Sequence, residues 1–149
     1  MKLLKWLSVT DRFAKTYLDT KLAPLGINSS QHMYLLKLCD QPGILQDSLL
    51  EYFYVHPSNI VRTISTLEKK GFLTREAYEQ DRRTWRLYPT EKALAAIDQI
   101  RAACEETEAV LMAEFSSSEQ DFFQDALFRA GKQIVKKISI DRMEDEFDE

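Results

Sequence analysis

Glycine, proline and cysteine are all scarce in this chain, which has four glycines, four prolines and two cysteines among its 149 residues. So little glycine and proline excludes a fibrous or low-complexity protein. Cys39 and Cys104 are too far apart for a CxxC motif or a metal-ligand spacing, so we expect two reduced thiols. No apolar run is long enough to span a bilayer and no secretory signal is evident. We therefore expect a cytoplasmic protein with no membrane partner.

Positive charge is also in short supply overall, since 20 Lys and Arg face 24 Asp and Glu, for a net charge of −4. The distribution is uneven, however. The last nine residues, DRMEDEFDE, sum to −5, and subtracting them from −4 leaves +1 for the rest of the chain. Residues 55–90 contain seven Lys and Arg but only four Asp and Glu. This basic middle segment suits a polyanionic partner in spite of the acidic total.

Helical periodicity is clear in the N-terminal part. Residues 3–22 carry two adjacent apolar stripes, which together form a wide face. A face this wide suggests contact with both the chain's own core and a second subunit. A second helix is predicted to follow Asn28, with Gln31 completing a capping box, and to end near Pro42.

The next two helical patterns are short and close together. Residues 44–53 have apolar positions at helical spacing, and a new helix is predicted to begin at Pro57, which suits a first turn. Gly71 is expected to end this second helix. Its buried stripe is predicted to consist of Ile60, Ile64 and Leu67, with Val61 at the edge. Two helices joined by only a few residues indicate a helix-turn-helix.

A two-stranded hairpin is predicted after Gly71. One strand begins at Phe72 and the other covers residues 84–88, with Trp85 and Leu87 facing the core. The charged segment YEQDRR between them forms its tip. Thr90 is expected to cap a long helix reaching about residue 115, and a last helix is expected over 118–138.

These elements predict a mainly α fold with a small β-hairpin wing. We expect a winged helix-turn-helix DNA-binding domain over 29–89. The helices of 1–28 and 90–140 are more than such a domain needs, and they predict a helical dimerisation region. The acidic tail, 141–149, is expected to be frayed.

Three segments then carry a family resemblance: LGINSSQHMYLLKLCDQPGILQ, LEKKGFLTREAYEQDRR and TEKA. In this order they resemble the MarR family of bacterial winged helix-turn-helix transcriptional regulators, and its SlyA-like branch in particular. The resemblance implies a homodimeric regulator of double-stranded DNA, expected to be a repressor and to be relieved by a small aromatic or anionic effector. His56 departs from the family pattern, which commonly has an Asp cap there.

The helix beginning at Pro57 is the expected recognition helix in the major groove. Arg62 can pair with guanine through O6 and N7, and Asn59 can read adenine. The alternative is that this is only the solvated face of an amphipathic helix. Further candidates for backbone or thymine contacts are Ser58, Thr63 and Thr66, with Gln46 and Ser48 at the preceding helix.

The hairpin tip is the expected minor-groove contact, because negative potential attracts arginine there. Asp81 can pair with Arg83 and brace the wing, which would leave Arg82 to enter the groove; the opposite assignment stays open. Arg75 and Arg86 are expected to support the wing or to touch phosphates. For Arg86, a charged strand edge that deters pairing is the alternative.

A dimer would place two recognition helices on a pseudo-palindrome with half-sites about 10 bp apart. We expect the interface to come from residues 3–22 and both ends of 118–140. The alternative is that these apolar residues belong to the core. The candidates are Leu3, Leu4, Leu7, Phe122, Ile134 and Ile138.

An effector site is expected between the dimer layer and the DNA-binding domain, with ordinary interhelix packing as the alternative. Its candidates are Phe13, Tyr17, His32, Met33 and Lys37, because aromatic walls with a cationic rim suit an aromatic carboxylate. No metal, cofactor or catalytic arrangement stands out, so we do not expect an enzyme. A winged-helix module that binds protein instead of DNA is the alternative function.

Overall fold

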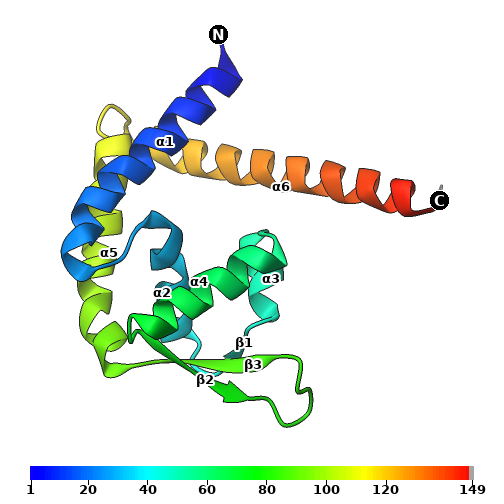
Figure 1. The fold of residues 1–149 in the computed structure, drawn as a ribbon. Coiled ribbons are helices and arrows are strands. Elements are labelled where there is room, and N and C mark those ends of the chain that lie inside the picture. Colours follow the sequence, from blue (N-terminus) through cyan, green and yellow to red (C-terminus); the bar gives the residue numbers. More distant parts are fainter. Residues whose placement is uncertain (148–149) are drawn as a thin grey trace. The chain divides into compact units, whose positions relative to one another are not determined.

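The computed structural model describes the backbone of residues 1–147 and the side chains of residues 1–139. The chain divides into two compact units, the first ending at Val110 and the second beginning at Leu111. In chain order the elements are α1 (Leu3–Leu22), the 3-10 turn η1 (Ala23–Leu25), α2 (Ser29–Asp40), β1 (Ile44–Leu45), α3 (Ser48–Phe53), α4 (Pro57–Lys69), β2 (Leu73–Ala77), β3 (Trp85–Pro89), α5 (Glu91–Leu111) and α6 (Ser117–Phe147) (Figure 1). The predicted class, mainly helical with a small β wing, is confirmed.

The predicted starts of α2 and α5 are both capped by side chains close to them in the sequence. Asn28 Oδ1 accepts the Ser30 N–H at 3.0 Å, and Gln31 Oε1 accepts the Asn28 N–H at 3.2 Å, so the capping box is present. The Thr90 hydroxyl donates to the Gly71 carbonyl at 2.6 Å and accepts the Ala93 N–H at 3.4 Å. Thr90 thereby caps α5 and ties its start to the end of α4.

The predicted two-stranded hairpin is present as β2 and β3, and a third strand that was not predicted, β1, pairs with β3 to give the antiparallel order β1-β3-β2. Ile44 pairs with Leu87 and Leu45 with Arg86. The helix predicted over 44–53 is therefore wrong in its first half, and only Ser48–Phe53 is helical. Pairing with β3 outweighs the helical spacing of Leu45 with the leucines that follow.

The core of the first unit lies where α4, the sheet and α5 meet α2. The predicted stripe of α4 is buried, and Leu87 of β3 is fully buried. Trp85 was expected to face the core as well, but 36% of it is exposed. It pairs with Ala77 at the end of the β2–β3 ladder, where the Arg75 guanidinium lies over its ring. The largest fully buried side chains are Leu22, Leu35, Leu38, Leu49, Ile64, Leu67, Phe72, Leu73, Leu87 and Ile100.

In the second unit, Ser116 and Glu119 form a reciprocal cap at the start of α6. Phe115 stacks on Phe123 with ring centroids 5.7 Å apart. The helix is longer than the predicted 118–138. The segment 141–149, predicted to be frayed, continues α6 as far as Phe147, and residues 148–149 lie outside the described part of the chain.

No helix within the described residues is both long enough and apolar enough to cross a membrane.

Candidate nucleic-acid interface

The connection between α3 and α4 consists of Tyr54, Val55 and His56, as the helix-turn-helix prediction requires. Tyr54 adopts a left-handed backbone conformation with φ of 54°, and its N–H closes α3 on the Leu50 carbonyl at 3.0 Å. The chain then re-enters a helix at Pro57. This tight turn fixes the angle at which α4 leaves α3.

His56 caps α4 in place of the more usual aspartate. Its Nδ1 accepts the backbone N–H of Ser58 at 3.1 Å, and the Ser58 hydroxyl lies 2.7 Å from the same nitrogen. The bond from the N–H requires Nδ1 to carry no proton. The imidazole thus supplies the acceptor that a carboxylate would otherwise offer.

The exposed face of α4 forms one stripe. Ser58, Val61, Arg62 and Lys69 are exposed, and Ser65 between them is half-buried. Val61 was not among the DNA contacts predicted from the sequence, because the apolar spacing of α4 placed it at the edge of the buried stripe. The available signal was its position three residues after Ser58 and next to Arg62, on the outward side of the helix.

Two of the residues predicted to contact DNA are buried. Thr63 is only 8% exposed and Gln46 only 9%, so neither side chain is available to a nucleic acid in this structure. Thr63 lies on the inward flank of α4. Gln46 follows β1, and its N–H donates to the Trp85 carbonyl at 2.8 Å, which extends the sheet instead of starting a helix. Ser48, the first residue of α3, is exposed as expected.

Asn59 and Thr66 are half-buried and make internal bonds. Asn59 Oδ1 accepts from the Tyr34 hydroxyl at 3.0 Å, and the Thr66 hydroxyl donates to the Arg62 carbonyl at 3.0 Å. Because Asn59 already uses one acceptor position, only its amide N–H groups and one remaining lone pair are open to a base. Arg62 is exposed on the same face of α4 as Ser58 and Val61.

At the wing tip, the predicted ion pair between Asp81 and Arg83 is present. Arg83 Nε lies 3.1 Å and Nη2 3.4 Å from the carboxylate, and the Arg83 backbone N–H donates to it at 3.0 Å. These bonds hold the pKa of Asp81 below its ordinary value. Arg82 beside them is exposed and makes no ion pair with any described residue.

Arg75 and Arg86 have structural partners. Arg75 makes two bonds to Glu68 of α4, from Nε to Oε2 at 2.9 Å and from Nη2 to Oε1 at 3.0 Å. Arg86 donates from Nη1 to the Gly43 carbonyl at 2.9 Å, and its guanidinium lies over the Tyr78 ring. Arg75 joins β2 to α4, and Arg86 joins β3 to the turn before β1.

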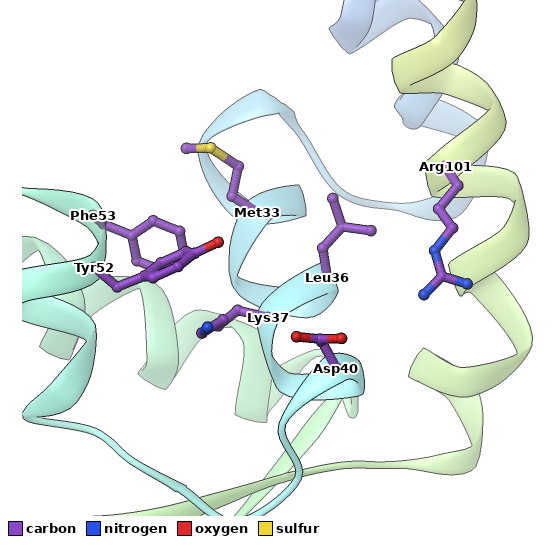
Figure 2. Close-up of a pocket in the computed structure, with 7 residues that line it drawn as sticks. All are labelled: Met33, Leu36, Lys37, Asp40, Tyr52, Phe53 and Arg101. Atoms are coloured by element: carbon purple, nitrogen blue, oxygen red, sulfur yellow. The ribbon is translucent and has the colours of Figure 1, made fainter. Parts of the chain in front are cut away.

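An open pocket of about 520 Å³ lies beside α2 in the first unit. Figure 2 shows Lys37 and Asp40 of α2 between the aromatic rings of α3 and Arg101 of α5. Lys37 Nζ lies 3.9 Å from the centroid of the Tyr52 ring. The lining residues are Met33, Leu36, Lys37, Asp40, Tyr52, Phe53 and Arg101.

Only part of the predicted effector set is in this pocket. Met33 and Lys37 line it, whereas Phe13, Tyr17 and His32 are not among its lining residues. Phe13 is exposed on α1. His32 is half-buried with Nδ1 2.6 Å from the Ser29 carbonyl, and burial lowers its pKa. The aromatic residues that do line the pocket are Tyr52 and Phe53 of α3. The sequence could not show this, because the packing of α3 next to α2 depends on the tertiary fold.

The two cysteines are half-buried, and burial raises the pKa of both thiols, which disfavours the reactive thiolate. Among the residues that the structure describes, no group of three or more His, Cys, Asp or Glu side chains could hold a metal ion.

Comparison with known proteins places this geometry in a family. Residues 27–85, the helix-turn-helix with most of the wing, match the model of the MarR family. The chain is 27% identical over 134 residues to the HTH-type transcriptional regulator YybA of Bacillus subtilis (strain 168), covering 90% of this chain and 89% of that one.

Solved structures agree with this match. A MarR transcriptional regulator from Methanosarcina mazei Go1 is 27% identical with a TM-score of 0.82, over 90% of this chain and 96% of that one. A MarR family transcriptional regulator from Listeria monocytogenes, solved with a 26mer DNA, is 24% identical with a TM-score of 0.83, over 92% and 91%. The winged helix of this chain, residues 27–85, matches the MarR family, and the fold of most of the chain is similar to that of MarR-type transcriptional regulators.

Proposed function

We propose that this regulator binds double-stranded DNA as a homodimer, with α4 in the major groove and the tip of the β2–β3 wing in the minor groove. The observation that carries the proposal is the pair of exposed arginines on one winged helix. Arg62 stands on the outward stripe of α4, and Arg82 stands beside the braced Asp81–Arg83 pair. Arginine is suited both to guanine edges and to the negative minor groove. The DNA complex of the Listeria relative supports the same partner.

The homodimer is supported by large apolar side chains that are exposed on α1 and, separately, on α6. The six predicted interface residues have exposed fractions between 45% and 80%. Large apolar side chains left this exposed on one helix favour a contact with another molecule. Two copies of α4 would then read half-sites about 10 bp apart. The residues are Leu3, Leu4, Leu7, Phe122, Ile134 and Ile138.

We further propose that the α2 pocket takes a small aromatic or anionic effector. Its aromatic wall of Tyr52 and Phe53 suits a planar ring, and Lys37 and Arg101 offer cations to a carboxylate. An effector that prefers a conformation with poorly spaced recognition helices would release DNA by population shift. We propose that the DNA-bound protein acts as a repressor in the cytoplasm, so that release by the effector would relieve repression.

The test is selection of bound duplexes from a random library by the full chain, followed by binding to the selected duplex at increasing salt. The expected result is a pseudo-palindromic site with half-sites about 10 bp apart. Affinity should fall steeply with salt, because phosphate contacts release counterions. Failure to enrich any sequence, with no salt-sensitive binding, would contradict the proposal and favour a protein partner for the winged helix.

A further inference from the structure

Val61 is an apolar side chain on the outward face of α4, and nothing in the core accounts for it. It is 56% exposed, and it is not part of the buried cluster. The core-facing residues of the same helix are Ile60, Ile64 and Leu67, each at most 2% exposed. An exposed branched hydrocarbon also slightly lowers helix propensity, so neither burial nor local structure explains its presence.

The position of Val61 along the helix places it where bases are read. Each residue of an α-helix turns by about 100°, so Val61 lies about 60° from Ser58 and about 100° from Arg62 around the axis. It is the fifth residue of a helix that begins at Pro57. In helix-turn-helix proteins the N-terminal part of the recognition helix contacts base edges. Val61 therefore lies beside Arg62 in the part of α4 that would enter deepest.

We propose that Val61 is a specificity-determining residue that contacts the C5 methyl group of a thymine in each half-site. The inference rests on the proposed DNA binding. Valine can neither donate nor accept a hydrogen bond, so it cannot recognise a phosphate or the polar atoms of a base. The thymine methyl is the apolar group that the major groove presents, and apolar side chains recognise it by contact.

The burial and hydrogen bonds of the neighbouring side chains also support this proposal. Thr63 is buried, and Asn59 is half-buried with its oxygen engaged by Tyr34, so two of the polar readers predicted from sequence are withdrawn or restricted. Val61 and Arg62 are adjacent exposed residues in that part of α4, one apolar and one cationic. Together they would read a thymine and a guanine a short distance apart.

The experiment replaces each thymine of the selected duplex by uracil, which removes only the methyl group. For the wild-type chain, replacing the contacted thymine in both half-sites should weaken binding by roughly tenfold to twentyfold, as expected for one buried methyl in each half-site. Val61→Ala should bind the thymine duplex more weakly than the wild type by a similar factor. Its affinity should not fall further when the thymine is replaced by uracil. Val61→Ser, which also removes the hydrocarbon contact, should behave in the same way.

Val110→Ala is the matched control, since Val110 of α5 is also 56% exposed and lies outside the winged helix. This variant should keep the uracil sensitivity of the wild type. The inference is overturned if Val61→Ala and Val61→Ser keep that sensitivity, or if no uracil substitution weakens the wild type. A chain that bound no duplex would instead overturn the DNA-binding proposal, and this inference with it.

Discussion

The hydroxyl of Tyr34 on α2 donates a hydrogen bond to Oδ1 of Asn59 on α4, across 3.0 Å. The ring of Tyr34 is almost fully buried and packs on Phe53 of α3, with centroids 4.7 Å apart. One side chain therefore contacts both helices of the helix-turn-helix. It also orients the Asn59 amide, so that its N–H groups and one lone pair of Oδ1 remain for a base.

Tyr34→Phe should lower the free energy of unfolding by about 1 kcal/mol, because the ring packing stays while a half-buried Asn59 oxygen loses its donor. A double-mutant cycle with Asn59→Ala, measured by denaturant unfolding at fixed protein concentration, isolates the bond. The expected coupling energy is about 0.5–1.5 kcal/mol. Two mutations that simply added would contradict a stabilising Tyr34–Asn59 bond.

Arg75→Lys tests whether Arg75 supports the wing or touches DNA. Its two bonds to Glu68 use the planar guanidinium, and lysine cannot reproduce both. The pair is partly exposed, so we expect a loss of stability below about 1 kcal/mol. Lysine keeps the charge, so Arg75→Gln is needed as the second variant. If Arg75 only supports the wing, Arg75→Gln leaves the salt dependence of binding unchanged; a slope lower by about one would assign it to a phosphate.

The histidine cap of α4 predicts that alanine at position 56 destabilises the protein, whereas aspartate does not. His56→Ala should lower the free energy of unfolding by about 1 kcal/mol, because the Ser58 N–H loses its acceptor. His56→Asp should retain or exceed the wild-type stability, since a carboxylate accepts the same bond and also favours the positive end of the helix. Thermal unfolding of the three proteins side by side provides the measurement. Equal melting of His56→Ala and wild type would mean that the imidazole contributes nothing as a cap.

The sequence predicted best what local chemistry decides. The Asn28–Gln31 box, Pro57 at the start of α4 and Thr90 at the start of α5 each depend on residues within a few positions of one another. Such caps satisfy backbone groups whatever the rest of the chain does. Likewise, Asp81 and Arg83 are two residues apart, and their ion pair was predictable from that spacing alone.

What depends on distant partners was missed. The two-residue strand β1 exists because β3, more than 40 positions later, pairs with it, and no periodicity can be read from so short a segment. Gln46 was assigned to a helix start for the same reason, but it is buried against the sheet. On α4, Thr63 and Val61 flank the core stripe on opposite sides. Which of them is buried depends on where α2 and α3 lie, so Thr63 was wrongly placed on the outward face, and Val61, placed at the edge of the buried stripe, is exposed.

Stability should depend on pH through His32. Burial lowers the pKa of His32 from its ordinary value of about 6.5, so the unfolded chain binds a proton more readily than the folded one. Stability is then lost as pH falls below about 6.5 toward the lowered folded value. In His32→Asn this contribution disappears. The difference in unfolding free energy between wild type and variant should shrink or reverse from about pH 7.5 to about pH 5.5. Parallel curves for the two proteins would contradict the assignment.

The wing prediction separates the two neighbouring arginines. Arg83 is engaged by Asp81 through its side chain and backbone, whereas Arg82 makes no ion pair with the described residues, so Arg82 is the one we expect in the minor groove. Arg82→Ala should weaken binding to the selected duplex by about tenfold and lower the salt slope by about one. Asp81→Asn removes the brace without removing a cation, so its loss of affinity should match that of Arg83→Ala and be the smaller one. Size-exclusion chromatography should find every variant in the same oligomeric state. If Arg83→Ala instead costs more than both Asp81→Asn and Arg82→Ala, Arg83 is the groove-binding residue, and its pairing with Asp81 must open when DNA binds.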